Sequence, residues 1–218
     1  MNAHTTPPRG SPNDSTAGPQ TGPHIKTLAI VYHSAQGHTA HIAHQVAAGA
    51  AAVANTRVTL LEAGQVARDP AGLAAYDGCI LGSPTYLGGV SGPFKLFMDA
   101  TGPLWRARAL EGRLAAGFTV SSLPAGDKQS TLQAMLTFCM QHGMVWVGNS
   151  FLPEQHAGVP EREAANRLGS WTGLMAQAGH GMPADAFAPG DVKNARMFGR
   201  HVAETLQRLA RVVDATAV

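Results

Sequence analysis

Residues 27–33 form a continuous apolar run of strand length, TLAIVYH. A run without polar alternation is typical of a strand that is buried on both faces of a parallel sheet. A small polar loop, SAQGH, follows it, and apolar residues then recur on one stripe of a helix that we expect from about 39 to 54, namely Ile42, Val46, Ala50 and Val53. Strand, loop and helix together predict the first half of a βα unit.

The same alternation continues along the chain. We expect further strands at residues 57–61, 78–83, 114–120 and 144–147, and helices at 93–100, at 128–142 and from Asp191 onward. Asp127 is expected to cap the second of these helices and Gly143 to end it. Residues 148–190 show weak periodicity and much Gly and Pro, and we interpret them as a long excursion. The alternation favours a doubly wound parallel α/β sheet.

Composition separates a tail from one domain. Residues 1–24 offer almost nothing to bury, so we expect a disordered tail followed by a single domain at 25–218. We find no secretory leader and no run of about 18 apolar residues, which predicts a cytoplasmic protein without a membrane segment. A net charge of +2 without Lys/Arg clusters disfavours nucleic acid as a partner. Cys79 and Cys139 form no C-x-x-C pair and are interpreted as buried thiols.

The first loop at the carboxyl edge of such a sheet is a candidate phosphate site, because doubly wound sheets bind ligands beyond the carboxyl ends of their strands. It comprises Ser34, Ala35, Gln36, Gly37, His38 and Thr39. Hydroxyls, a glycine that tolerates positive φ and free amides at a helix N-terminus can hold a phosphate without Lys or Arg. A plain turn capped by Thr39 is the alternative.

The loop at residues 82–89, GSPTYLGG, joins a stiff proline to a pair of glycines. It could lay main-chain amides along a planar ring, with Tyr86 and Leu87 supplying apolar area. Other motifs fail: there is no G-x-x-x-x-G-K, and none of Ser34, Ser83 and Ser91 has the glycines of a hydrolase elbow. The G-x-G-x-x-A match at 179–184 follows no expected strand and carries a proline where a helix should start, so we interpret it as coincidental.

Histidines raise two further possibilities. His38, His41 and His44 lie close together around the first expected helix and could bind zinc or copper, but no Cys, Asp or Glu ligand is near them. We therefore favour a solvated helix face and expect no metal. His142 precedes Gly143 at a helix end, where it could either stabilise the last carbonyls or belong to a functional site.

Three segments together resemble a known family. SAQGHT after the first strand, GSPTYLGGVSGPFKLFMDATGPLW after the third and QHGMVWVG into the fifth resemble the flavodoxin-related NAD(P)H-dependent FMN reductases, and more specifically the NAD(P)H:quinone oxidoreductases of the tryptophan-repressor-binding-protein type. The resemblance implies a flavodoxin-like fold, with five parallel strands in the order 2-1-3-4-5 and helices on both faces. It implies FMN as cofactor, with these binding residues: Ser34, Ala35, Gln36, Gly37, His38 and Thr39 at the phosphate, Pro84, Thr85, Tyr86, Leu87 and Gly88 beside the isoalloxazine ring, and Ser121, Ser122 and the residues to Asp127 in a third loop.

The function that the resemblance implies is an oxidoreductase that passes a hydride from NAD(P)H through flavin N5 to a quinone or similar small acceptor. Its catalytic residues would be Tyr86, His142 and Trp105, with Trp105 reached across the boundary of a homodimer or homotetramer. Apolar residues in the excursion also favour an interface, namely Phe151, Leu152, Trp171, Leu174 and Met175. A flavodoxin-type electron carrier and a non-enzymatic flavin-binding regulator remain alternatives. The charge of +2 disfavours the carrier, which usually docks through an acidic surface.

Overall fold

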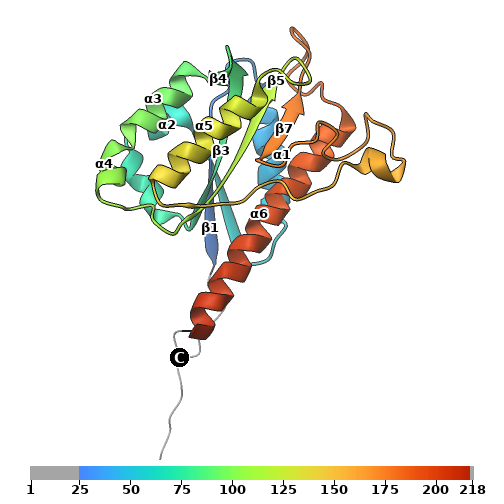
Figure 1. The fold of residues 1–218 in the computed structure, drawn as a ribbon. Coiled ribbons are helices and arrows are strands. Elements are labelled where there is room, and N and C mark those ends of the chain that lie inside the picture. Colours follow the sequence, from blue (N-terminus) through green and yellow to red (C-terminus); the bar gives the residue numbers. More distant parts are fainter. Residues whose placement is uncertain (1–24, 217–218) are drawn as a thin grey trace, which may run out of the picture.

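A parallel sheet forms the centre of the molecule. The computed structural model describes residues 25–216, with side chains as far as residue 210, so the expected tail at 1–24 lies outside the described residues. The principal strands are β1 (Lys26–Tyr32), β2 (Thr56–Glu62), β3 (Gly78–Tyr86), β5 (Leu114–Ser121) and β6 (Val145–Trp146). They run parallel in the spatial order β2-β1-β3-β5-β6 (Figure 1). This confirms the flavodoxin-like order that the sequence indicated.

The fifth position of the sheet is shared by two short strands. β6 pairs with the beginning of β5, and β7 (Leu174–Gln177) pairs with its end. A Cβ on Gly173 would lie 2.4 Å from the carbonyl oxygen of Gly117, so the two backbones approach closely just before β7. The expectation of a single strand at 144–147 followed by a strandless excursion was wrong. Leu174 and Met175 are buried in this sheet and need no partner chain to cover them.

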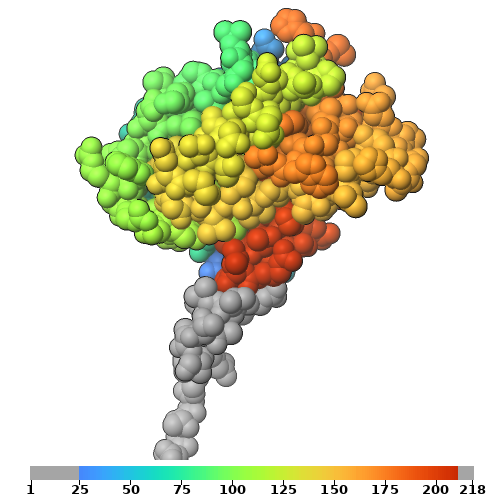
Figure 2. Space-filling model, in the orientation of Figure 1, coloured from blue at the N-terminus to red at the C-terminus, as the bar shows by residue number. Residues whose placement is uncertain are grey.

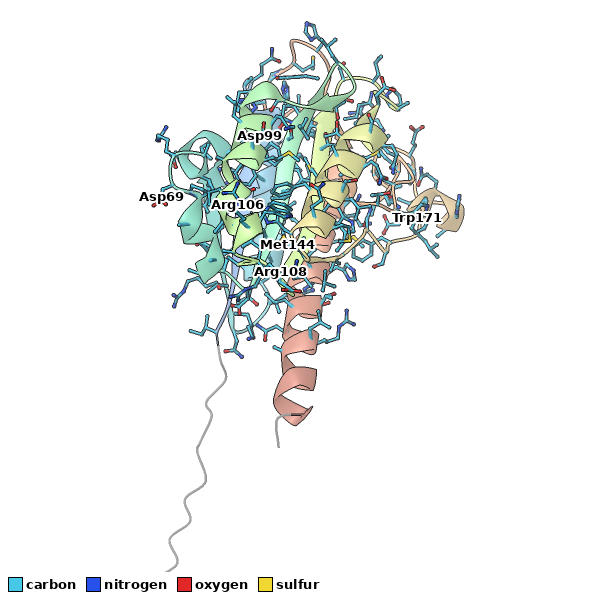
Figure 3. All side chains as sticks on the ribbon, turned by 60° about the vertical axis from the view of Figure 1, so that its left-hand side comes forward. Asp69, Asp99, Arg106, Arg108, Met144 and Trp171 are labelled. Atoms are coloured by element: carbon cyan, nitrogen blue, oxygen red, sulfur yellow. The ribbon has the colours of Figure 1, made fainter. Side chains whose placement is uncertain are left out.

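The segment between β6 and β7 forms a lobe beside α5 (Lys128–Gln141), seen on the right of Figure 2. It contains the short 3-10 helix η2 (Glu154–Ala157). Trp171 lies on this lobe and is half exposed (Figure 3), and Leu152 is more exposed still. Trp171 and Leu152 could therefore still contact a second chain, whereas the buried Leu174 and Met175 could not.

Helices cover both faces of the sheet, as expected. Alternate residues of β1 point to opposite sides: Leu28 and Ile30 pack with α1 (His38–Ala51) and α6 (Pro189–Thr216), while Ala29 and Val31 pack with the other helices. The second layer comprises α2 (Ala63–Val66), the 3-10 helix η1 (Pro70–Ala75), α3 (Gly92–Ala100), α4 (Gly102–Arg106) and α5. A Cβ on Gly199 of α6 would lie 2.0 Å from the carbonyl oxygen of Val46 in α1, so these two helices cross in close contact. Among residues 25–216, no helix combines the length and the apolar character that a bilayer crossing requires.

Three local expectations differ from the structure. β3 continues through Pro84 to Tyr86 and forms a hairpin with β4 (Gly89–Val90), so only the tip of the expected 82–89 loop is a turn. Asp127 has φ +52° and makes no capping hydrogen bond, so its side chain does not cap α5. α6 begins two residues before Asp191. Gly143 has φ +72° directly after the last residues of α5, which confirms it as the helix terminator.

Candidate functional site

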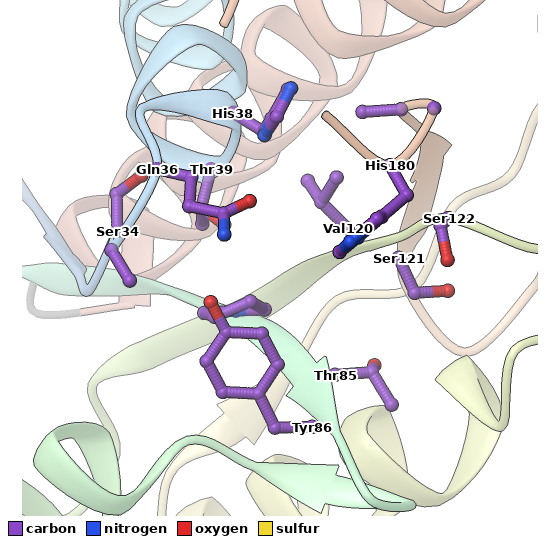
Figure 4. Close-up of a pocket in the computed structure, with 14 residues that line it drawn as sticks. Ser34, Gln36, His38, Thr39, Thr85, Tyr86, Val120, Ser121, Ser122 and His180 are labelled. Carbon is purple, nitrogen blue, oxygen red and sulfur yellow. The ribbon is translucent and has the colours of Figure 1, made fainter. Parts of the chain in front are cut away.

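Loops from four strands meet at the carboxyl edge of the sheet around a cavity of about 270 Å³ (Figure 4). Its lining comes from the β1–α1 loop, the end of β3, the end of β5 and the residues after β7: Ser34, Ala35, Gln36, His38, Thr39, Pro84, Thr85, Tyr86, Val120, Ser121, Ser122, Ala178, Gly179 and His180. The structure therefore brings together the three loops that the sequence singled out, and it adds a fourth.

The other residues of the expected cofactor site, namely Gly37, Leu87, Gly88 and 123–127, do not line this cavity. Gly37 forms the turn beneath it, and Leu87 and Gly88 form the tip of the β3–β4 hairpin, where Leu87 is fully exposed. Asp127 lies at the start of α5, outside the lining. These residues therefore belong to the loops around the cavity, but their atoms do not line it.

The fourth loop is the part that sequence reasoning missed. Gly179 and His180 belong to the G-x-G-x-x-A match that we had dismissed because no strand was expected before it. That reason was wrong, since β7 ends at Gln177. The match is still no dinucleotide fingerprint, because the next helix begins only at Pro189.

The first loop ends in an uncapped helix N-terminus. Gly37 occupies the N-cap position of α1 with φ +85°, and no side chain caps the helix, so the alternative of a turn capped by Thr39 is wrong. Within the described residues, the main-chain N–H groups from Ser34 to Ala40 donate to no main-chain acceptor. The hydroxyl of Ser34 is buried without a hydrogen-bond partner. Unpaired donors at the positive end of a helix suit an anion.

The fourth loop folds over the first. The ring of His38 lies with Nε2 3.1 Å from the carbonyl oxygen of Met182, and it meets Phe187 edge-on. His41 stacks on the same phenyl ring at 5.5 Å between centroids. His44 is exposed, whereas His38 and His41 are partly exposed and also pack on Phe187. The loop after β7 is held to α1 by these rings.

Buried hydroxyls fix the end of β3. The hydroxyl of Thr85 lies 2.8 Å from those of both Thr119 and Thr131, and Thr119 donates to the carbonyl oxygen of Ser83. The N–H of Ser91 donates to the hydroxyl of Ser83, which ties the start of α3 to the same strand. The main chain at Pro84 and Thr85 is therefore rigid where it borders the cavity.

His142 and Trp105 lie in a different part of the fold from the first cavity. They line a second cavity of about 620 Å³ between α3, α4 and α5, which shares no lining residue with the first. Nε2 of His142 lies 3.0 Å from the hydroxyl of Thr101, its ring packs edge-on against Phe138, and its Nδ1 is buried without a partner. Trp105 is half exposed. Within one chain, the structure does not bring these two residues to Tyr86.

Burial lowers the pKa of His142, which predicts a loss of stability in acid. Because the folded pKa lies below the ordinary value of 6.5, the unfolded chain binds the proton first. Stability should fall as the pH drops below about 6.5 and level off below the folded pKa. We expect His142→Gln to lose less unfolding free energy than the wild type between pH 7 and pH 5, measured by urea unfolding. His44→Gln, at an exposed site, is the control; an unchanged slope in His142→Gln would contradict the prediction.

Comparison with known proteins places this geometry among flavoproteins. The profile of the family described as NADPH-dependent FMN reductase matches residues 25–157. An NAD(P)H dehydrogenase (quinone) of Archaeoglobus fulgidus is 36% identical, with 84% of this chain and 98% of that protein covered. Flavodoxin FldP of Pseudomonas aeruginosa is 33% identical over 85% of this chain and 99% of its own length. The crystal structure of a WrbA-like flavodoxin from Agrobacterium tumefaciens superposes with a TM-score of 0.65 at 30% identity, covering 84% of this chain and 98% of that one.

Proposed function

The chain belongs to the NADPH-dependent FMN reductase family, and from that premise we propose that the first cavity holds FMN and that a quinone accepts its electrons. The protein is an FMN-dependent oxidoreductase that takes electrons from NAD(P)H. The observation that carries the placement of FMN is the unpartnered Ser34 hydroxyl beside the free N–H groups that lead into α1. A phosphate monoester would satisfy these donors.

The remaining walls fit the other parts of the cofactor. The end of β3 presents a rigid main chain at Pro84 and Thr85, and the half-exposed ring of Tyr86 offers apolar area at the rim. Ser121 and Ser122, at the end of the neighbouring strand β5, supply further polar groups. No lysine or arginine of the described residues lines the cavity, so the phosphate would be held by helix and loop donors alone.

Bound FMN supplies the chemistry, since it accepts a hydride from NAD(P)H and gives two electrons to an acceptor. The chain's own part is to bind the cofactor, orient it and leave one side accessible. The hydroxyl contacts of Thr85 keep the β3 wall in place, and the hairpin that follows it exposes Leu87 at its tip. Relatives named NAD(P)H dehydrogenase (quinone) support a quinone as the acceptor.

An electron carrier is the second candidate, because one relative is named a flavodoxin. The net charge of +2 argues against it, since carriers usually dock through acidic surfaces. Steady-state oxidation of NADPH and NADH by the purified, FMN-loaded protein, with and without a benzoquinone, distinguishes the two. Quinone-dependent turnover of either nucleotide supports the reductase. A protein that binds FMN and turns over neither nucleotide would be the carrier or a non-enzymatic regulator.

We also propose that the working form is a homodimer or homotetramer whose site is completed by Trp105 of a neighbouring chain. Trp105 is half exposed at the second cavity, and His142 beside it has an unpartnered ring nitrogen. Exposed aromatic area of this kind is enriched at interfaces. Together with the exposed Leu152 and Trp171, it supports an assembly.

Trp105→Ala should lower kcat/KM for the quinone by about tenfold or more, while FMN stays stoichiometric, because an aromatic contact of about 1.4 kcal/mol or more would be lost. Stopped-flow and steady-state kinetics measure kcat/KM for the quinone, and the flavin absorption spectrum measures the amount of bound FMN. Val145→Ala, also at an exposed apolar residue but outside both cavities, is the matched control. Sedimentation that shows an active monomer at assay concentration would refute the shared site, and unchanged kinetics would remove Trp105 from it.

A further inference from the structure

Lys128 is unusual among the described residues, because it is the one lysine with no exposed surface. It is the first residue of α5, and its side chain returns beneath the loop that precedes the helix. Nζ donates to the carbonyl oxygen of Leu123 at 2.5 Å and to that of Pro124 at 3.2 Å. The ammonium group thus ties together the loop from Ser121 to Asp127, whose first two residues line the cavity.

The charge of Lys128 is not balanced by a carboxylate of its own. Asp191 at the start of α6 is the acidic group that acts on it, and Arg167 is the second cation. Arg167 takes both oxygens of Asp191, at 2.8 and 2.9 Å, and the N–H of Gln177 donates to the same carboxylate. Glu161 lies 3.8 Å from Arg167 but is largely exposed. One carboxylate therefore serves two buried or nearly buried cations, which leaves a net positive charge behind the loop.

This arrangement costs stability. Burial lowers the pKa of Lys128 to about 8, Asp191 opposes the shift and Arg167 adds to it. A lowered lysine pKa means that the fold disfavours the charged form. An apolar side chain of similar length would fill the same space without that penalty. The two carbonyl contacts and the position behind the cavity wall indicate that the charge acts on the loop and on the cavity beside it.

We propose that Lys128 is a positioning residue for the flavin site: its ammonium group fixes the Ser121–Asp127 loop as one wall, and its positive charge favours the reduced cofactor over the oxidised one. The proposal rests on the placement of FMN in the first cavity. Two electrons and one proton convert the neutral oxidised ring into a reduced ring with one negative charge. A cation behind the Ser121–Asp127 wall stabilises that charge, and it acts much less on the neutral ring.

The Ser121–Asp127 loop is held from a second side by the same cluster. The side-chain amide of Gln177 donates to the carbonyl oxygen of Ser122 at 3.1 Å, and Arg167 lies 3.2 Å from the amide oxygen of Gln177. Gly126 permits the turn, because a Cβ there would lie 2.1 Å from the Ser121 hydroxyl. Replacing Lys128 alone therefore leaves the loop partly anchored, so its charge can be tested in a folded protein.

Two substitutions separate the charge from the contacts. Lys128→Met keeps the length and removes both charge and donor, whereas Lys128→Gln removes the charge and keeps an N–H donor. Titration of the apoprotein with FMN, oxidised and then reduced under anaerobic conditions, gives the two dissociation constants. We expect both variants to bind reduced FMN about tenfold less well relative to oxidised FMN than the wild type does, which lowers the two-electron potential by about 30 mV. The melting temperature should be unchanged or higher.

Lys26→Met is the control, because Lys26 is the first residue of β1 and lies at the edge of the sheet away from the cavity. This variant should keep the wild-type ratio of the dissociation constants for reduced and oxidised FMN. A wild-type ratio in Lys128→Gln would overturn the role of the charge. A wild-type ratio in both variants together with a lower melting temperature would make Lys128 a purely structural residue. If Gly37→Asp binds FMN as the wild type does, the placement of FMN fails instead, which is a different result from an unchanged ratio in the Lys128 variants.

Discussion

Gly37→Asp should lose FMN binding almost completely, by more than about 100-fold in dissociation constant. Gly37 has φ +85°, which costs a side-chain-bearing residue about 1–2 kcal/mol. The new Cβ would lie 2.6 Å from Cβ of Ala184 in the loop that folds over α1. The added carboxylate would put a negative charge in the loop that holds the phosphate, and two like charges about 4 Å apart repel by about 4 kcal/mol at an effective dielectric constant of 20. The strain and the contact with Ala184 distort the phosphate loop itself, and the repulsion acts on the bound cofactor.

Quenching of flavin fluorescence during titration of the apoprotein measures this loss. Gly37→Ala isolates the steric and backbone effects from the charge and should bind with intermediate affinity. Gly64→Asp places the same side chain on α2, where a Cβ meets no atom within 4 Å, and should bind like the wild type. Wild-type affinity in Gly37→Asp would mean that the phosphate lies elsewhere on the molecule.

Asp191→Ala should destabilise the fold by about 3–5 kcal/mol, which is a large part of the typical total of about 5–15 kcal/mol. The Asp191 side chain is 3% exposed and accepts two hydrogen bonds from Arg167, whose side chain is 9% exposed. Without the carboxylate, Arg167 and Lys128 would be two neighbouring buried cations with no anion between them. The N–H of Gln177 in β7 would also lose its acceptor.

Urea unfolding measures this change, with Glu204→Ala as the control. Glu204 pairs with Arg200 across the exposed surface of α6 at 3.6 Å, so its loss should change the unfolding free energy by no more than about 1 kcal/mol. Combining Asp191→Leu with Arg167→Met removes both charges and should recover much of the stability lost in Asp191→Ala. A loss below about 1 kcal/mol in Asp191→Ala would show that Arg167 is not held by this carboxylate.

The parts of the site that sequence reasoning located are those with local signals. The β1 run, the small loop after it and the amphipathic stripe of α1 all lie within about thirty consecutive residues, so their periodicity and turn residues identify them directly. The doubly wound sheet indicated its carboxyl edge as the ligand site, and the resemblance of three loops in chain order implied that the ligand is FMN. The alternation of strands and helices predicted a parallel doubly wound sheet, and the resemblance implied the order of β2, β1, β3 and β5 within it.

Non-local contacts decided the rest. The four residues of β7 are too few to show a period, and they become a strand only because β5, more than fifty residues earlier, supplies the partner edge. That pairing brings Gly179 and His180 to the cavity. The same holds for Lys128, which by sequence begins a helix and in the fold is covered by its own loop, within electrostatic reach of Arg167 and Asp191. The sequence by itself determined β1, β2, β3 and β5, the phosphate-type loop and the family, because those depend on neighbours along the chain. The pairing of β7, burial and charge pairing were decided only by the tertiary structure, because they depend on which distant segments pack together.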